Sequence, residues 1–102
     1  MLEWKTIVVN GKNYIGMQMV LPKQKIFVIS STKCILIGRM FQIDNMAQGS
    51  CVFIMEKSNS FEDLLTSCVI AMNAKAKFLG YHIGMTGKEV LSYVPYQKKS
   101  SY

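Results

Sequence analysis

The sequence predicts an α+β fold, in which a mainly antiparallel sheet of about five strands precedes one long and one short helix. Three observations support this class. Apolar, β-branched segments separated by turn residues fill the first half of the chain, apolar residues recur at helical spacing in the second half, and an Asn-Gly pair marks a hairpin. At 102 residues, the chain is expected to form a single domain over 1–102.

The first two predicted strands form a hairpin. Residues 4–9 are rich in β-branched side chains, and Asn10-Gly11 favours a tight turn because both residue types accept a positive φ. Residues 14–21 alternate and end at Pro22. One face of this strand would carry Ile15, Met17, Met19 and Leu21, and the other would carry Tyr14, Gly16, Gln18 and Val20.

The central strands are predicted at three continuously apolar segments, 26–29, 34–38 and 51–55. Continuous apolar sequence is typical of strands that are covered on both faces. Between the last two segments, residues 42–49 favour one helical turn that ends at Gly49.

The helical half of the chain begins at Ser60, which with Asp63 resembles a capping box. Apolar residues then recur at helical spacing, so that a helix of about five turns is predicted over 61–79, with Gly80 after its end. The apolar positions are Phe61, Leu64, Leu65, Cys68, Met72 and Leu79.

A second capping box, formed by Thr86 and Glu89, predicts a short helix over 87–94 that ends before Pro95. The sequence therefore divides into a strand hairpin (1–21), central strands (22–57), helices (58–94) and a polar tail (95–102).

Two helices cover about one face of a five-stranded sheet, because a packed helix is about 10 Å wide and strands lie about 4.8 Å apart. The other face of the apolar central strands then needs a second cover. We expect another copy of the chain to supply it through the first hairpin and the uncovered face, in a homo-oligomer for which a tetramer is favoured and a dimer is possible. The alternative is a monomer whose sheet closes into a barrel.

Composition excludes several classes of function. The net charge is +6, but the lysines are scattered and Arg39 is the single arginine, so nucleic-acid binding is not expected. Three dispersed cysteines and one histidine, His82, do not fit a disulfide framework or a zinc site, and no metal or cofactor is expected. Without a signal peptide or an apolar run of membrane length, the expected location is the cytoplasm, with no membrane partner.

The segment Gly84-Met85-Thr86-Gly87-Lys88-Glu89 is the one that most invites a functional interpretation. It lacks the spacing of a nucleotide-binding P-loop, and Glu89 stands where such a loop needs a hydroxyl residue. A structural interpretation explains the segment as a tight turn with a capped helix. A functional one places a small anion against the backbone N–H groups, beside Lys88. The candidate ligand-binding residues are Arg39, Asp44, His82, Gly84, Thr86, Gly87 and Lys88.

Two functions remain open, since no catalytic motif is evident and the catalytic residues are unknown. The first is a non-enzymatic oligomeric protein that binds a small ligand or a partner at subunit junctions. The second is an enzyme with a small polar pocket, in which His82 is a possible general base. That pocket would combine Gly38, Arg39, Asp44, His82 and Lys88. Turn chemistry also explains Asp44, and Arg39 needs a carboxylate partner, for which Asp44 and Glu56 are candidates, or an exposed edge.

Residues 14–91 resemble the YunC-like family of small archaeal and bacterial proteins, a domain of unknown function. The resemblance is carried by Leu21-Pro22, Ile37-Gly38, the segment Phe61-Glu62-Asp63-Leu64-Leu65 and, most specifically, the segment from Leu79 to Leu91. It implies an α+β fold with an N-terminal strand region used to form tetramers, and it implies no established activity. Many relatives have Cys-Gly where this chain has Ile37-Gly38, so any chemistry of that cysteine would be lost here.

Overall fold

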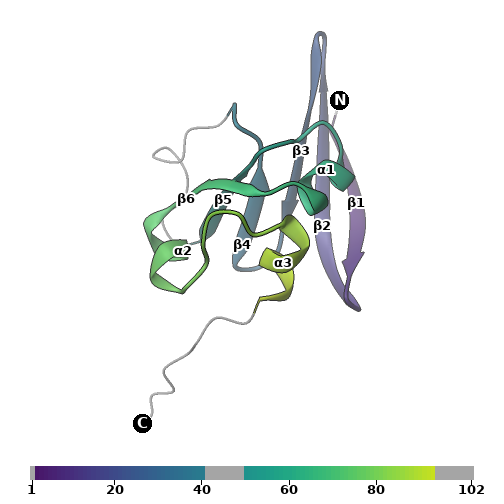
Figure 1. Cartoon of the computed structure of the whole chain (residues 1–102). Helices are drawn as coiled ribbons and strands as arrows, with labels where there is room; N and C mark the ends of the chain where they lie inside the picture. Colours follow the sequence, from purple (N-terminus) through teal and green to yellow (C-terminus); the bar gives the residue numbers. More distant parts are fainter. Residues whose placement is uncertain (1, 41–49, 94–102) are drawn as a thin grey trace.

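The structure is a computed structural model that describes residues 2–40 and 50–93. This part of the chain forms a six-stranded sheet and three short helices, so the α+β class is confirmed (Figure 1). The elements are β1 (Leu2–Val9), β2 (Lys12–Leu21), β3 (Gln24–Ser30), β4 (Cys34–Ile37), β5 (Cys51–Met55), α1 (Phe61–Thr66), β6 (Val69–Met72), α2 (Ala74–Phe78) and α3 (Gly87–Ser92). The strands lie in the sheet in their sequence order.

The predicted hairpin is present between β1 and β2. Val9 pairs with Lys12, and the two turn residues between them, Asn10 and Gly11, have φ values of 52° and 79°. Two positive φ values are the mark of the turn that matches the twist of a hairpin. The alternation along β2 also holds, because Tyr14 is buried beneath the helices whereas Ile15 is exposed on the opposite face.

One strand pair departs from the antiparallel pattern. β4 and β5 are parallel, and their register runs from Cys34 opposite Cys51 to Ile37 opposite Ile54. The helical turn that the sequence predicts at 42–49 belongs to the connection between these strands and lies outside the described residues. Because β4 and β5 are parallel, their first residues lie side by side at one end of the strand pair and their last residues lie side by side at the opposite end.

The prediction of one long helix over 61–79 is wrong. The chain leaves α1 at Ser67, whose backbone is extended and whose hydroxyl bonds both the N–H and the C=O of Lys57. It then adds β6 to the sheet, beside β5. Asn73 caps the new helix α2 by accepting the N–H of Ala76, and it accepts the N–H of Val52 as well. Side-chain bonds from Ser and Asn thus replace the helical continuation that apolar spacing alone indicates.

The ends of the observed helices follow the predicted signals. Ser60 accepts the N–H of Asp63 at the start of α1. Thr86 and Glu89 form the capping box of α3, with bonds of 3.2 Å and 2.9 Å. Gly80, with a φ of 98°, follows α2 rather than a long helix. α3 ends at Ser92, with Tyr93 already extended, so the predicted end of this helix at 94 is wrong by two residues. Pro95 and the polar tail lie outside the described residues.

The main core lies between the sheet and the three helices, where it includes Ile29, Leu36, Phe53, Leu64 and Val90 (Figure 1). A smaller buried cluster of Ile37, Val52 and Ile54 lies on the opposite face of β4 and β5. All five residues of β5 are therefore buried within a single chain. The expectation that another copy must cover this segment is wrong, and the uncovered apolar surface lies on β1–β3 instead.

Candidate functional site

A wide cavity of about 860 Å³ lies where β4 and β5 end. Its walls come from three places: the first part of β3 with the turn before it, the residues that follow β4, and the residues that follow β5 together with the first turn of α1. In open sheets, the carboxyl ends of parallel strands are a frequent place for ligands, because the chain leaves the sheet there and opens a crevice. We call this space the Arg39 cavity; it is lined by Lys23–Phe27, Gly38–Met40, Glu56–Asn59 and Asp63.

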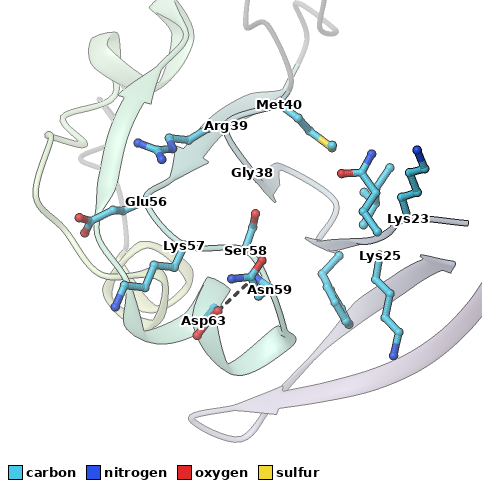
Figure 2. Close-up of a pocket in the computed structure, with 13 residues that line it drawn as sticks. Lys23, Lys25, Gly38, Arg39, Met40, Glu56, Lys57, Ser58, Asn59 and Asp63 are labelled. Atoms are coloured by element: carbon cyan, nitrogen blue, oxygen red, sulfur yellow. Dashed lines mark hydrogen bonds between the residues drawn. The ribbon is translucent and has the colours of Figure 1, made fainter. Parts of the chain in front are cut away.

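The floor of the Arg39 cavity depends on a close approach between two loops. Gly38 faces the Ser58 side chain so closely that an added Cβ would collide with the Ser58 hydroxyl. Figure 2 shows Ser58 near the centre of the cavity, beside Gly38. Glycine at position 38 therefore permits the close approach of the segments that follow β4 and β5.

Positive charge predominates around the cavity. Lys23, Lys25, Arg39 and Lys57 line it, against two carboxylates, Glu56 and Asp63. Figure 2 shows the two lysines of the β2–β3 side across the cavity from Arg39 and Lys57.

Asp63 is already occupied by the local backbone. Its Oδ2 accepts the N–H of Asn59 at 3.1 Å (Figure 2). Among the described lining residues, Glu56 is then the only carboxylate whose oxygens accept no hydrogen bond. Four cationic side chains against two carboxylates give the described lining a net charge of +2.

Arg39 does not form the ion pair that the sequence suggests with Glu56. Within residues 2–40 and 50–93 its guanidinium forms no ion pair, and the residue is exposed. The other expected partner, Asp44, lies outside the described residues. An exposed arginine at the mouth of a cationic cavity can bind an external anion through its planar fork of N–H donors.

The segment from Gly84 to Glu89 has a structural explanation. Gly84 has a φ of 98°, Thr86 and Glu89 cap α3, and Gly87 packs against the backbone of α1. The Gly87 N–H donates to the carbonyl oxygen of Ser67, so that this donor is already used. Lys88 is exposed on α3.

The residues proposed for an enzymatic pocket do not share one cavity. Gly38 and Arg39 line the Arg39 cavity, whereas His82 lines a shallow hollow with Met85, Glu89, Ser92 and Tyr93. The imidazole Nδ1 of His82 lies 3.4 Å from the carbonyl oxygen of Ile83. Lys88 lines neither space, and Asp44 is outside the described residues.

Sequence reasoning missed Lys23, Lys25, Lys57 and Ser58 as cavity residues. The available signal was the glycine at the end of a strand, because a glycine there marks a close approach of another segment. The parallel pairing of β4 and β5, which brings Gly38 and Ser58 together, has no local signature in the sequence.

A second candidate surface lies on the open face of β1–β3. The register places 13 residues on it, none of which is charged. Trp4 and Val8 are each 63% exposed and Ile15 is 53% exposed. We call this surface the open β face; it comprises Leu2, Trp4, Thr6, Val8, Asn13, Ile15, Met17, Met19, Leu21, Gln24, Ile26, Val28 and Ser30.

Comparisons with known proteins support the fold alone. The chain is similar to a crystal structure of a protein of unknown function from Thermoplasma acidophilum, with a TM-score of 0.79 and 17% sequence identity over 90% of this chain and 91% of that one. No protein-family model matches the sequence. No curated protein matches it either.

Two further features are absent from the described residues. No group of three or more His, Cys, Asp or Glu side chains gathers there as a metal-binding cluster. None of the helices in residues 2–40 and 50–93 has the length and apolar character needed to cross a membrane.

Proposed function

We propose that this protein is a non-enzymatic binding protein of the cytoplasm that self-associates through the open β face and holds a small, multiply charged anion in the Arg39 cavity. The proposal of an anionic ligand rests on the four cationic side chains that line one cavity. One of the two lining carboxylates, Asp63, accepts the N–H of Asn59. Three free cysteines agree with a reducing compartment.

Binding is favoured over catalysis by what lines the cavity. Its described residues include one hydroxyl nucleophile, Ser58, but neither a histidine nor a cysteine. Activation of a serine needs an adjacent base, and Asp63 is directed to the backbone of Asn59 instead. Cationic side chains without a base and nucleophile pair can hold an anion without transforming it.

Pyrophosphate is the probe for the Arg39 cavity. Its binding is measured by titration, with the backbone amide signals of the protein recorded by NMR. We expect saturable shifts at Gly38–Met40 and Glu56–Asn59. Replacement of two cations, Arg39→Gln with Lys57→Gln, should weaken binding at least about tenfold, which is about 1.4 kcal/mol. The matched control, Lys5→Gln with Lys77→Gln, removes the same charge outside the Arg39 cavity and should bind as the unmodified chain does. Equal weakening in both variants, or shifts that do not saturate, would contradict the proposal.

A second copy of the chain is the occupant that best fits the open β face. The whole chain carries a charge of +6, which disfavours contact between most surfaces of two copies. The open β face contains none of those charges, so two copies can meet there without repulsion at the contact. Apolar patches of this kind on small proteins mark interaction sites. The resemblance to the YunC-like family, in which N-terminal strands form tetramers, supports the same surface and favours a tetramer.

Trp4 is the single tryptophan, so its fluorescence reports on this surface directly. On concentration, its emission should shift to shorter wavelength as sedimentation detects larger species. Trp4→Gln should weaken association at least about 30-fold, because a buried aromatic anchor of an interface contributes about 2 kcal/mol or more. Phe78→Gln is the control, since Phe78 is 86% exposed on α2. A protein that stays monomeric at high micromolar concentration would refute self-association.

A further inference from the structure

A second cavity, of about 450 Å³, lies at the opposite end of the parallel strand pair, where β4 and β5 begin. We call it the Cys34 cavity. It lies on the side of the sheet that the helices cover, since Cys34, Cys51 and Tyr81 belong to the main core. It is lined by Lys12, Tyr14, Ser31–Cys34, Cys51, Lys75, Leu79, Tyr81, Val90, Leu91 and Tyr93. Its volume falls within the range of about 300 to 1,000 Å³ that is typical of small-molecule sites.

The inner walls of the Cys34 cavity are apolar and aromatic. Leu79, Val90 and Leu91 line it, and the rings of Tyr81 and Tyr93 pack with their centroids 4.7 Å apart. A flat or aliphatic body placed against these side chains would lose contact with water and gain dispersion contacts.

The polar lining of the cavity has one sign of charge. Lys12, Lys33 and Lys75 contribute ammonium groups, and no carboxylate is among the described lining residues. Lys75 is close enough to Cys51 for its positive charge to act on that thiol, where it lowers the pKa. Burial and the neighbouring Cys34 outweigh this effect, and the pKa of Cys51 is raised overall.

One hydrogen-bond donor lies at the inner end of the cavity. The Tyr81 hydroxyl is 3.7 Å from the Sγ of Cys34, and sulfur is a weak acceptor. Burial raises the pKa of Tyr81, so that the phenol keeps its proton at physiological pH. It can therefore donate to an oxygen of a bound molecule in place of the thiol. The Tyr14 hydroxyl already donates to the Leu91 carbonyl oxygen, at 2.9 Å.

We propose that the Cys34 cavity binds a small organic anion, in which a carboxylate or phosphate group meets the three lysines and an apolar body lies against the Tyr81 and Tyr93 walls. An inorganic anion would leave these walls in contact with water, and a neutral apolar molecule would gain nothing from the charges of Lys12 and Lys33. This site is separate from the Arg39 cavity, so the two proposals can fail independently.

Amide NMR of the full chain tests this assignment with three probes: phenyl phosphate, inorganic phosphate and benzyl alcohol. Phenyl phosphate combines the charge and the ring, and each of the others supplies one of them. We expect phenyl phosphate to shift the signals of Ser31–Cys34, Cys51 and Tyr81, with an affinity at least about tenfold higher than that of either other probe.

Lys12→Gln with Lys33→Gln should weaken phenyl phosphate binding at least about fivefold. Lys5→Gln with Lys77→Gln should leave it unchanged. All four lysines are exposed, and the unliganded spectra of the variants verify that the fold is retained.

Three results would overturn the proposal. The first is equal binding of benzyl alcohol, which would indicate a purely apolar pocket. The second is a shift pattern confined to Lys23–Phe27 and Gly38–Met40, which would place the anion in the Arg39 cavity. The third is an equal loss of binding in both double variants, which would indicate attraction by net charge alone.

Discussion

The burial of Tyr81 in the Cys34 cavity makes the free energy of unfolding depend on pH in the alkaline range. The pKa of Tyr81 is raised mainly by burial and further by Cys34, so the folded state holds the phenolic proton more tightly than the unfolded chain does. Below about pH 10 both states keep that proton, and above it the unfolded state releases its proton first. The free energy of unfolding should therefore fall as the pH rises, by up to about 1.4 kcal/mol per pH unit for this group.

Tyr81→Phe should remove this part of the pH dependence, as followed by urea unfolding between about pH 9 and pH 12. The difference in stability between Tyr81→Phe and the unmodified chain should change only above about pH 10. The raised pKa of Cys51 adds a similar loss from about pH 8.5, which is common to both proteins and cancels in the comparison. A difference that is constant across this range would contradict the assignment.

At the scale of elements, the packing of α3 on α1 depends on Gly87. An added Cβ at this position would overlap with the carbonyl oxygen of Leu64, which is held in α1. Gly→Ala in an accessible helix usually stabilises by about 0.4 to 1 kcal/mol, because it reduces the entropy of the unfolded chain. At this contact we expect the opposite sign, a loss of about 1 to 3 kcal/mol.

Thermal unfolding of Gly87→Ala measures this loss. Each kcal/mol corresponds to about 4 to 8 °C in a domain of this size. Lys88→Ala is the control on the next, exposed position of α3, and it should change the melting temperature little. An unchanged or higher melting temperature for Gly87→Ala would show that α3 can move away from α1 without cost.

Elements with a local chemical signal were predicted well from the sequence. The Asn10-Gly11 turn, the alternation in β2 and the caps at Ser60 and Thr86 each depend on neighbouring residues only. The segment 61–79 was predicted wrongly because α1, β6 and α2 happen to place apolar residues at helical spacing.

The bonds that separate these three elements connect residues distant in sequence. Ser67 bonds Lys57, and Asn73 bonds Val52 and Ser50. The candidate site was predicted only at Gly38 and Arg39 for the same reason, since pairing of β4 with β5 is needed to bring Lys57 and Ser58 beside them.

At the scale of the whole molecule, net charge and the open β face have opposing effects on self-association. Copies that each carry a charge of +6 repel one another, while the uncharged face attracts another copy through apolar burial. The Debye length falls from about 10 Å at 0.1 M salt to about 3 Å at 1 M salt. Added salt should therefore strengthen association.

Sedimentation at these two salt concentrations tests the balance, with sodium chloride as the salt. A contact formed by ion pairs would weaken with salt, so weaker association at high salt would exclude the open β face as the principal interface. Ile15→Lys places a charge in the middle of this face on every copy and should abolish association at both salt concentrations.

The order of the strands along the chain also bears on biosynthesis. β1, β2 and β3 are joined by two-residue turns and leave the ribosome before any of the helices that cover their inner face. Until α1 and α3 emerge, inner-side residues such as Ile7, Phe27 and Ile29 have no helix to cover them. The open β face is exposed at the same time and the β1 edge is unpaired, which is the situation in which newly made chains aggregate. We therefore expect truncated chains that end before α3 to require a chaperone or to form inclusion bodies.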